Sequence, residues 1–136
     1  MEMPKTSVLT IFTGEMPYTL ENILAMDFLS QILNIRYTAT LREEKGGTYG
    51  VQTSGGASFA PVQTYMLFTI FDTDPAMADE LKQDIVNEIQ KLSEEGVKEE
   101  DLSKIKEYFT KQYPDQIKQN GYWLGTLVNY HLYGYD

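Results

Sequence analysis

A short run of strand-forming residues near the N-terminus is followed by a long segment with apolar residues at helical spacing. Residues 8–12, Val-Leu-Thr-Ile-Phe, are rich in β-branched and aromatic side chains and end near Gly14, which predicts a first strand. From Thr19 onward, apolar residues recur at helical spacing and predict an amphipathic helix that packs on a sheet. They are Leu20, Ile23, Leu24, Phe28, Leu29, Ile32 and Leu33. A shorter helical turn over Tyr37–Lys45 should then end at Gly46-Gly47, a pair suited to positive φ.

The middle of the chain has a strand pattern on both sides of a second glycine pair. Residues 48–53, Thr-Tyr-Gly-Val-Gln-Thr, predict one strand, and Gln63–Phe71 is the strongest strand candidate in the sequence. Between them, Gly55-Gly56 predicts a turn or a disordered tip. The two strands are therefore expected to follow each other closely along the chain.

Helical patterns fill the rest of the chain. Asp74-Pro75 is a typical helix start, and an apolar stripe then leads to a stop at Gly96. The stripe consists of Leu81, Ile85, Ile89 and Leu92. A further helix begins with the acidic residues 99–101 and should be kinked or broken by Pro114, and a last helical pattern runs from Tyr122 toward Gly134.

This order of elements predicts an α+β fold with an antiparallel or mixed sheet that helices cover on one face. Residues 1–136 contain no linker-like or repetitive stretch, so we expect one domain. The apolar pattern runs up to the C-terminus without a following element, and the sequence predicts only three clear strands against four helical segments. We therefore expect a fragment of a longer multidomain protein, with the fold incomplete at its C-terminal end.

Composition removes several classes of chemistry. The chain has 20 acidic and 11 basic residues, a net charge of −9, one histidine and no cysteine. Disulfides and thiolate nucleophiles are excluded, and a zinc site normally needs more imidazole or thiolate ligands than His131 alone provides. The acidic balance argues against nucleic acid and anionic membranes as partners. The longest apolar stretches are far too short to cross a bilayer, so we expect no membrane insertion.

The most distinctive segment is Leu41-Arg42-Glu43-Glu44-Lys45-Gly46-Gly47-Thr48-Tyr49-Gly50-Val51. It resembles the L-R-E-x-x-G-x-x-Y-G-V segment of the second, non-zinc-binding domain of the pitrilysin, insulinase and mitochondrial processing peptidase family. Arg42 and Tyr49, seven positions apart, occupy the family's Arg and Tyr positions. Supporting matches extend over essentially the whole chain. They are the strand 65–71, the helix after Asp74-Pro75, Leu92-x-x-x-Gly96-Val97 with Glu100-Asp101-Leu102, and Asn120-x-Tyr122-Trp123-Leu124.

The resemblance implies the substrate-binding half of a zinc metallopeptidase that hydrolyses peptide bonds. In this family the zinc is held by an inverted His-x-x-Glu-His motif and a distal Glu in another domain. That motif is absent from this chain, so the resemblance implies that the chain holds no metal and no catalytic residue and is inactive when isolated. The implied partners are the zinc-binding N-terminal domain of the same protein and a peptide substrate. The resemblance favours the bacterial periplasm or cell envelope as the compartment.

The residues themselves suggest what Arg42 and Tyr49 could do. A helix end, a glycine turn and a strand start can direct a guanidinium and a phenol toward one point, where both would donate hydrogen bonds to a peptide carbonyl. The resemblance implies contact with the substrate backbone or with the oxyanion that develops during hydrolysis. In the structural alternative, Arg42 pairs with Glu43, Glu44 or a neighbouring helix, and Tyr49 is a half-buried strand aromatic.

Other candidate groups favour structural roles. His131 is expected to be a surface or interface residue, and adjacent carboxylates such as Glu94-Glu95 point in different directions on a helix and should be solvated. The aromatic cluster Tyr122, Trp123, Tyr130, Tyr133 and Tyr135 suggests core packing or an interface exposed by truncation. Two alternative functions stay open, a non-catalytic scaffold or partner subunit of the same fold and an unrelated acidic interaction module. A homo-oligomer is also among the partners that the sequence allows.

Overall fold

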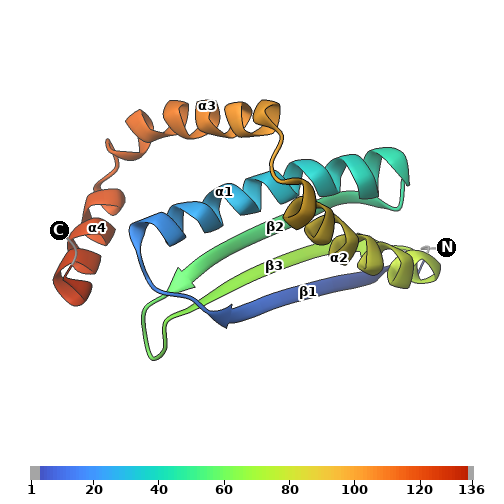
Figure 1. Cartoon of the computed structure of the whole chain (residues 1–136), viewed down its shortest axis with the longest axis horizontal. Coiled ribbons are helices and arrows are strands. Elements are labelled where there is room, and N and C mark those ends of the chain that lie inside the picture. Colours follow the sequence, from blue (N-terminus) through green and yellow to red (C-terminus); the bar gives the residue numbers. More distant parts are fainter. Residues whose placement is uncertain (1–3, 135–136) are drawn as a thin grey trace. The chain divides into compact units, whose positions relative to one another are not determined.

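The computed structural model describes residues 4–134, which divide into two compact units between Lys98 and Glu99. The first unit contains three strands and two long helices (Figure 1). Its elements are β1 (Thr6–Glu15), α1 (Leu20–Tyr37), the π-helical segment η1 (Thr38–Glu44), β2 (Thr48–Ser58), β3 (Thr64–Thr73), the 3₁₀ turn η2 (Pro75–Met77) and α2 (Ala78–Glu95). The second unit consists of α3 (Glu99–Gln116) and α4 (Asn120–Tyr133).

The strands form an antiparallel sheet in the order β1-β3-β2 (Figure 1). The central strand is β3, which contains the sequence's strongest strand pattern. Ile70 on β3 pairs with Leu9 on β1 and with Gln52 on β2. The register of β2 against β3 shifts between Thr48 and Val51, as at a β-bulge. The predicted α+β class is confirmed, and the sheet is antiparallel throughout the described residues.

One face of the sheet packs against the helices, and the other is open. Along β1, partly buried and exposed residues alternate, as they do on a strand with one covered face. The covered face and the helices supply the core, in which Leu33, Tyr37, Leu41, Leu81 and Ile85 are completely buried. This arrangement confirms the predicted sheet with helices on one face, and it leaves the opposite face available for contacts.

The prediction of a turn at Gly55-Gly56 is wrong, because both residues lie inside β2, which runs to Ser58. A Cβ atom on Gly55 would lie 2.8 Å from Oγ of Ser30 and 3.0 Å from Cε of Met26, both on α1. Glycine is therefore needed here for the close approach of helix and sheet, rather than for a change of chain direction.

The predicted helix boundaries are largely found. Thr19 caps α1 by accepting a hydrogen bond from the backbone of Asn22, and Asp74 accepts one from the backbone of Ala76 at the start of η2. Gly96 ends α2 with φ of 75°. The expected separate turn after Tyr37 instead continues directly from α1 as η1.

In the second unit, α3 continues through Pro114 and ends at Gln116, so the proline does not break the helix where it occurs. Tyr122 packs edge-on against Tyr113 and Trp123, with ring centres 6.4 and 5.4 Å apart. Trp123 is 49% exposed, so the predicted aromatic cluster is not core packing within the described residues. Tyr135, the last member of that cluster, lies outside the described residues.

Candidate functional site

The segment with Arg42 begins in η1, the π-helical continuation of α1. Leu41 is completely buried, which fixes the segment to the core, while the neighbouring Arg42 is exposed. The backbone then closes a turn, because the amides of Gly46 and Gly47 donate to the carbonyls of Arg42 and Leu41 at 3.1 and 3.0 Å. Gly46 has φ of 61°, a conformation that favours glycine, so the predicted helix stop is confirmed. Single π-helical turns occur frequently at functional sites.

Gly47 and Thr48 join this turn firmly to the sheet and to α2. A Cβ atom on Gly47 would lie 2.7 Å from a methyl group of Leu81, so only glycine fits without movement of its neighbours. The hydroxyl of Thr73 on β3 donates to the carbonyl of Gly47 at 2.5 Å. The start of β2, and with it Tyr49, is therefore held close to the core.

Arg42 has an exposed side chain that forms no ion pair with any residue in the range 4–134. The neighbouring Glu43 and Glu44 are exposed as well. The structural alternative, in which Arg42 pairs with these carboxylates or with a neighbouring helix, is not found among the described residues. Its guanidinium is available to a ligand.

Tyr49 is 86% exposed and lies in the irregular part of β2, between Thr48 and Val51. The alternative of a half-buried strand aromatic is therefore wrong. Lys5 lies over the Tyr49 ring, with Nζ 5.8 Å from the ring centre, a distance at which a cation and an aromatic face attract each other. An exposed phenol is thus presented next to a positive charge.

Tyr49 and Lys5 line two neighbouring cavities. One, of about 640 Å³, lies against β2 and β3 and includes Gln52, Ile70 and Asp72. The other, of about 320 Å³, extends over the Gly46-Gly47 turn toward Met77 of η2. Together they surround Tyr49 with space of the size that small ligands or part of a peptide can occupy.

The structure brings Tyr49 together with Lys5 rather than with Arg42, which does not line either cavity. Arg42 and Tyr49 lie on the two sides of the same glycine turn. Sequence reasoning missed Lys5, because no motif marks it. Its place follows only from the pairing of Thr6 and Thr48 with the same residue of β3, Thr73.

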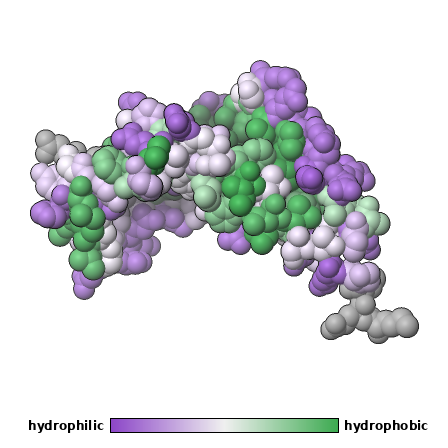
Figure 2. All heavy atoms as spheres, turned by 90° about the horizontal axis from the view of Figure 1, so that it is seen from below, coloured by the Kyte–Doolittle hydropathy of each residue, from purple (hydrophilic) through white to green (hydrophobic). Residues whose placement is uncertain are grey.

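The open face of the sheet continues from the larger cavity as an apolar surface. Leu9, Ile11, Met66 and Ile70 are between 39% and 56% exposed there. Hydrophobic side chains also gather on the surface of the molecule seen from below in Figure 2. Apolar surface of this kind suits the side chains of an extended peptide.

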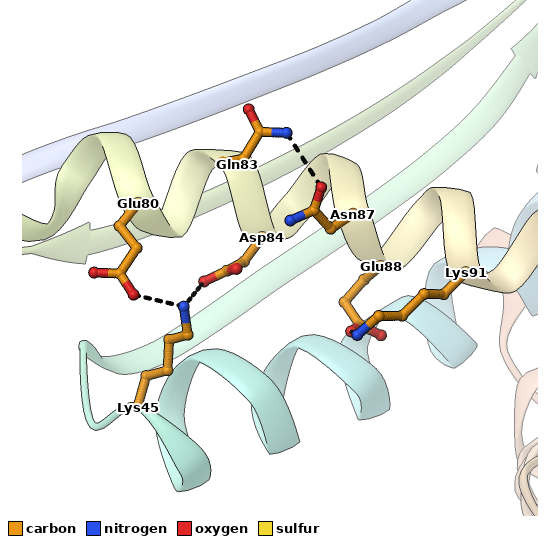
Figure 3. Close-up of polar contacts among 7 residues, drawn as sticks. All are labelled: Lys45, Glu80, Gln83, Asp84, Asn87, Glu88 and Lys91. Carbon is orange, nitrogen blue, oxygen red and sulfur yellow. Dashed lines mark hydrogen bonds and ion pairs between the residues drawn. The ribbon is translucent and has the colours of Figure 1, made fainter.

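Behind the turn, a cluster of ion pairs joins Lys45 to α2 (Figure 3). Nζ of Lys45 lies 2.6 Å from Oε1 of Glu80 and 2.5 Å from Oδ2 of Asp84. These hydrogen bonds, first the one with Asp84, raise the pKa of Lys45 above its ordinary value. Farther along α2, Glu88 pairs with Lys91 at 2.9 Å.

No group of three or more His, Cys, Asp or Glu residues that could hold a metal ion occurs within residues 4–134. His131, the lone histidine, is exposed on α4. The paired carboxylates Glu94 and Glu95 are exposed on the last turn of α2, as predicted for a solvated face. The donor set of residues 4–134 therefore does not fit a catalytic zinc, which needs about three protein ligands in one place.

None of the helices described is long and apolar enough to span a lipid bilayer.

Three comparisons relate this chain to known proteins. The family model of the peptidase M16 inactive domain matches residues 1–109. A zinc protease PQQL-like protein of Arabidopsis thaliana is 29% identical over 116 residues, which cover 80% of this chain and 12% of the relative. The crystal structure of the periplasmic protease PqqL from Escherichia coli superposes with a TM-score of 0.80 at 19% identity. That match covers 96% of this chain and 14% of the other chain, so the chain spans only a small part of the length of either relative.

Proposed function

Because the chain belongs to the family of the peptidase M16 inactive domain, we propose that it is the substrate-binding half of a zinc metallopeptidase that hydrolyses peptide bonds. Family membership confirms the resemblance inferred from the Arg42-to-Tyr49 segment. It also excludes the alternative of an acidic interaction module unrelated to peptidases.

The observation that supports a substrate-binding role is the exposed Tyr49 in the lining of two cavities, across the glycine turn from Arg42, which forms no ion pair within residues 4–134. Both side chains carry hydrogen-bond donors that suit a peptide carbonyl oxygen, on which negative charge develops during hydrolysis. One such donor contributes about 10²–10³ to the rate in other hydrolases. The proposed role of Arg42 and Tyr49 is contact with the substrate backbone or with that developing oxyanion.

In this proposal the zinc and the general base belong to another domain of a longer protein. Two observations support this: the lack of a metal-ligand cluster in residues 4–134, and the 12% and 14% of the two relatives that the chain covers. The proposed partners are a zinc-binding N-terminal domain and a peptide substrate. The periplasm or cell envelope is the proposed compartment, supported by the periplasmic protease with the same fold.

The division of roles can be tested on the purified chain and on the longer protein. The chain alone should bind no zinc at stoichiometric amounts and should not hydrolyse peptides, whereas the longer protein should do both. Tightly bound zinc with turnover in the isolated chain would overturn the proposal. Absence of a His-x-x-Glu-His motif from the longer protein would favour the scaffold function instead.

The site residues are tested by single substitutions in the longer protein. Arg42→Ala and Tyr49→Phe should lower peptide turnover while the far-UV circular dichroism and the unfolding midpoint stay unchanged, since both side chains are exposed. Tyr108→Phe is the matched control, because Tyr108 is a 45% exposed tyrosine on α3, outside the site. If both variants hydrolysed the peptide as fast as Tyr108→Phe, Arg42 and Tyr49 would have no part in substrate contact.

A further inference from the structure

We propose that Lys45 is a positioning residue for the substrate-binding site, because its ion pairs attach the turn between Arg42 and Tyr49 to α2. This inference rests on the proposed function of those two residues. Lys45 does not line either of the cavities around Tyr49. Its effect would therefore be exerted through the backbone of the turn and not through contact with the peptide.

Lys45 stands where η1 ends and the glycine turn begins. Its amide donates to the carbonyl of Thr40 at 3.2 Å, so its backbone completes the π-helical segment that carries Arg42. Its side chain crosses to α2, where Glu80 and Asp84 are one helical turn apart and both point at the ammonium (Figure 3). A single side chain thus bridges the turn and a helix of the core.

The pair with Asp84 is the stronger half of this bridge. The side chain of Asp84 is only 16% exposed, and its Oδ2 atom is buried with no other partner among the described residues. A buried carboxylate without a compensating charge is strongly unfavourable, so Asp84 holds Lys45 in place. Glu80, which is 61% exposed, adds a more strongly screened and therefore weaker contact on the solvent side.

The turn needs such a restraint because its first residue is unconstrained by packing. Gly46 has positive φ, and a Cβ atom there would meet no atom within 4 Å. Packing of the turn begins only at the next residue, Gly47. Without Lys45, the end of η1, which carries Arg42, would lose its ion pairs with Glu80 and Asp84 of α2.

The chain offers a matched control in Lys91. This lysine also forms an ion pair with a carboxylate of α2, Glu88, at 2.9 Å, but both partners are on the same helix. Its removal deletes a comparable charge and a comparable contact without releasing the turn. Lys45→Arg is the conservative variant, because it keeps the positive charge between Glu80 and Asp84.

Amide hydrogen exchange of the 136-residue chain tests the attachment without any assay of activity. Lys45→Ala should speed exchange of the Gly46 and Gly47 amides by about five- to tenfold, and Asp84→Asn should act in the same direction. Lys91→Ala should leave both amides unchanged, Lys45→Arg should restore the slow exchange, and the amide of Leu33 in the core should not respond. Should Lys45→Ala fail to fold, Asp84→Asn decides by the same measurement.

Unchanged exchange at the turn, or equally faster exchange throughout the core, would overturn the inference. In the longer protein, Lys45→Ala should lower kcat more than it changes KM, and Lys45→Arg should recover it. Faster exchange at the turn with wild-type kcat would also overturn the positioning role, provided that Arg42→Ala and Tyr49→Phe are impaired. If those two variants hydrolyse the peptide at the wild-type rate, the proposed function fails instead. The exchange data then show separately whether Lys45 holds the glycine turn in place.

Discussion

The ammonium group of Lys5 lies over the ring of Tyr49, 5.8 Å from its centre, although the two residues are 44 positions apart in the sequence. β1 and β2 both pair with β3, and this arrangement brings the residue before β1 next to the start of β2. The contact places a positive charge beside the exposed phenol, and both residues line both cavities. It therefore adds a cation to the proposed substrate-binding site.

The Lys5–Tyr49 contact predicts a ring-current shift. The ε-methylene protons of Lys5 should resonate upfield of those of Lys118, an exposed lysine on the other unit, because they lie near the face of an aromatic ring. Tyr49→Leu should move them to the position of an ordinary lysine. Identical Lys5 resonances in the wild type and Tyr49→Leu would contradict the contact, and NMR of the labelled chain makes the comparison.

Gly47→Ala should destabilise the fold, whereas Gly50→Ala should not. An added Cβ on Gly47 would lie 2.7 and 3.0 Å from the two methyl groups of Leu81, while one on Gly50 would meet nothing within 4 Å. Overpacking of this kind costs about 1–3 kcal/mol. Urea unfolding of the two variants measures the difference, and equal midpoints would show that the turn is not packed against α2 as described.

The free energy of unfolding should fall at alkaline pH because the phenol of Tyr37 is buried. Burial, and secondly the negative charge of Glu88, raise the pKa of its phenol, against an opposing hydrogen bond with Thr69. Because the folded phenol stays neutral while the unfolded one ionises above its ordinary value of 10.0, this stability is present below pH 10 and is lost as the pH rises.

The variant Tyr37→Phe separates this ionisation from the hydrogen bond that the hydroxyl donates to the carbonyl of Ile85 at 3.2 Å. At pH 8 the variant should be less stable by about 0.5–1.5 kcal/mol. The deficit should shrink above pH 10, because phenylalanine has no proton to lose. A constant deficit between pH 8 and pH 11 in chemical unfolding would contradict the raised pKa.

Substitution of Asp27 on α1 should raise stability at neutral pH, whereas Tyr37→Phe should lower it. Burial raises its pKa above the ordinary 3.8, so the folded state disfavours the ionised carboxylate. This penalty is present at neutral pH and disappears as the pH falls through the raised folded pKa to below 3.8. Asp27→Asn should therefore be more stable than the wild type at pH 7 and equal to it at pH 3. Lower stability of the variant at pH 7 would show that the carboxylate is stabilised by the fold.

Local patterns predicted most of the helices and strands, because capping residues and apolar periodicity act within a few residues of each other. Gly55-Gly56 was interpreted wrongly for a physical reason. A glycine that permits a turn and a glycine that permits close contact with α1 look the same in sequence, and only the packing against Ser30 and Met26 distinguishes them. The predicted helix break at Pro114 is also wrong, because α3 continues past the proline to Gln116.

The candidate site was predictable only where it depends on a contiguous motif. The spacing of Arg42 and Tyr49 around a glycine turn was readable, and the exposure of both side chains agrees with a binding role. Lys5 and the bridge from Lys45 to Asp84 were not predictable, because they join residues 44 and 39 positions apart that only the sheet register and the docking of α2 bring together.

The most direct test of the central claim is kcat/KM for peptide hydrolysis by the longer protein, measured for Arg42→Ala, Tyr49→Phe and the double variant. If both donors serve the substrate or the developing oxyanion, each single substitution should lower kcat/KM by up to about 10²–10³. The double variant should then fall short of the product of the two single effects, because the donors act on the same peptide. Wild-type kcat/KM in all three folded variants would contradict the claim that this chain supplies the substrate contacts.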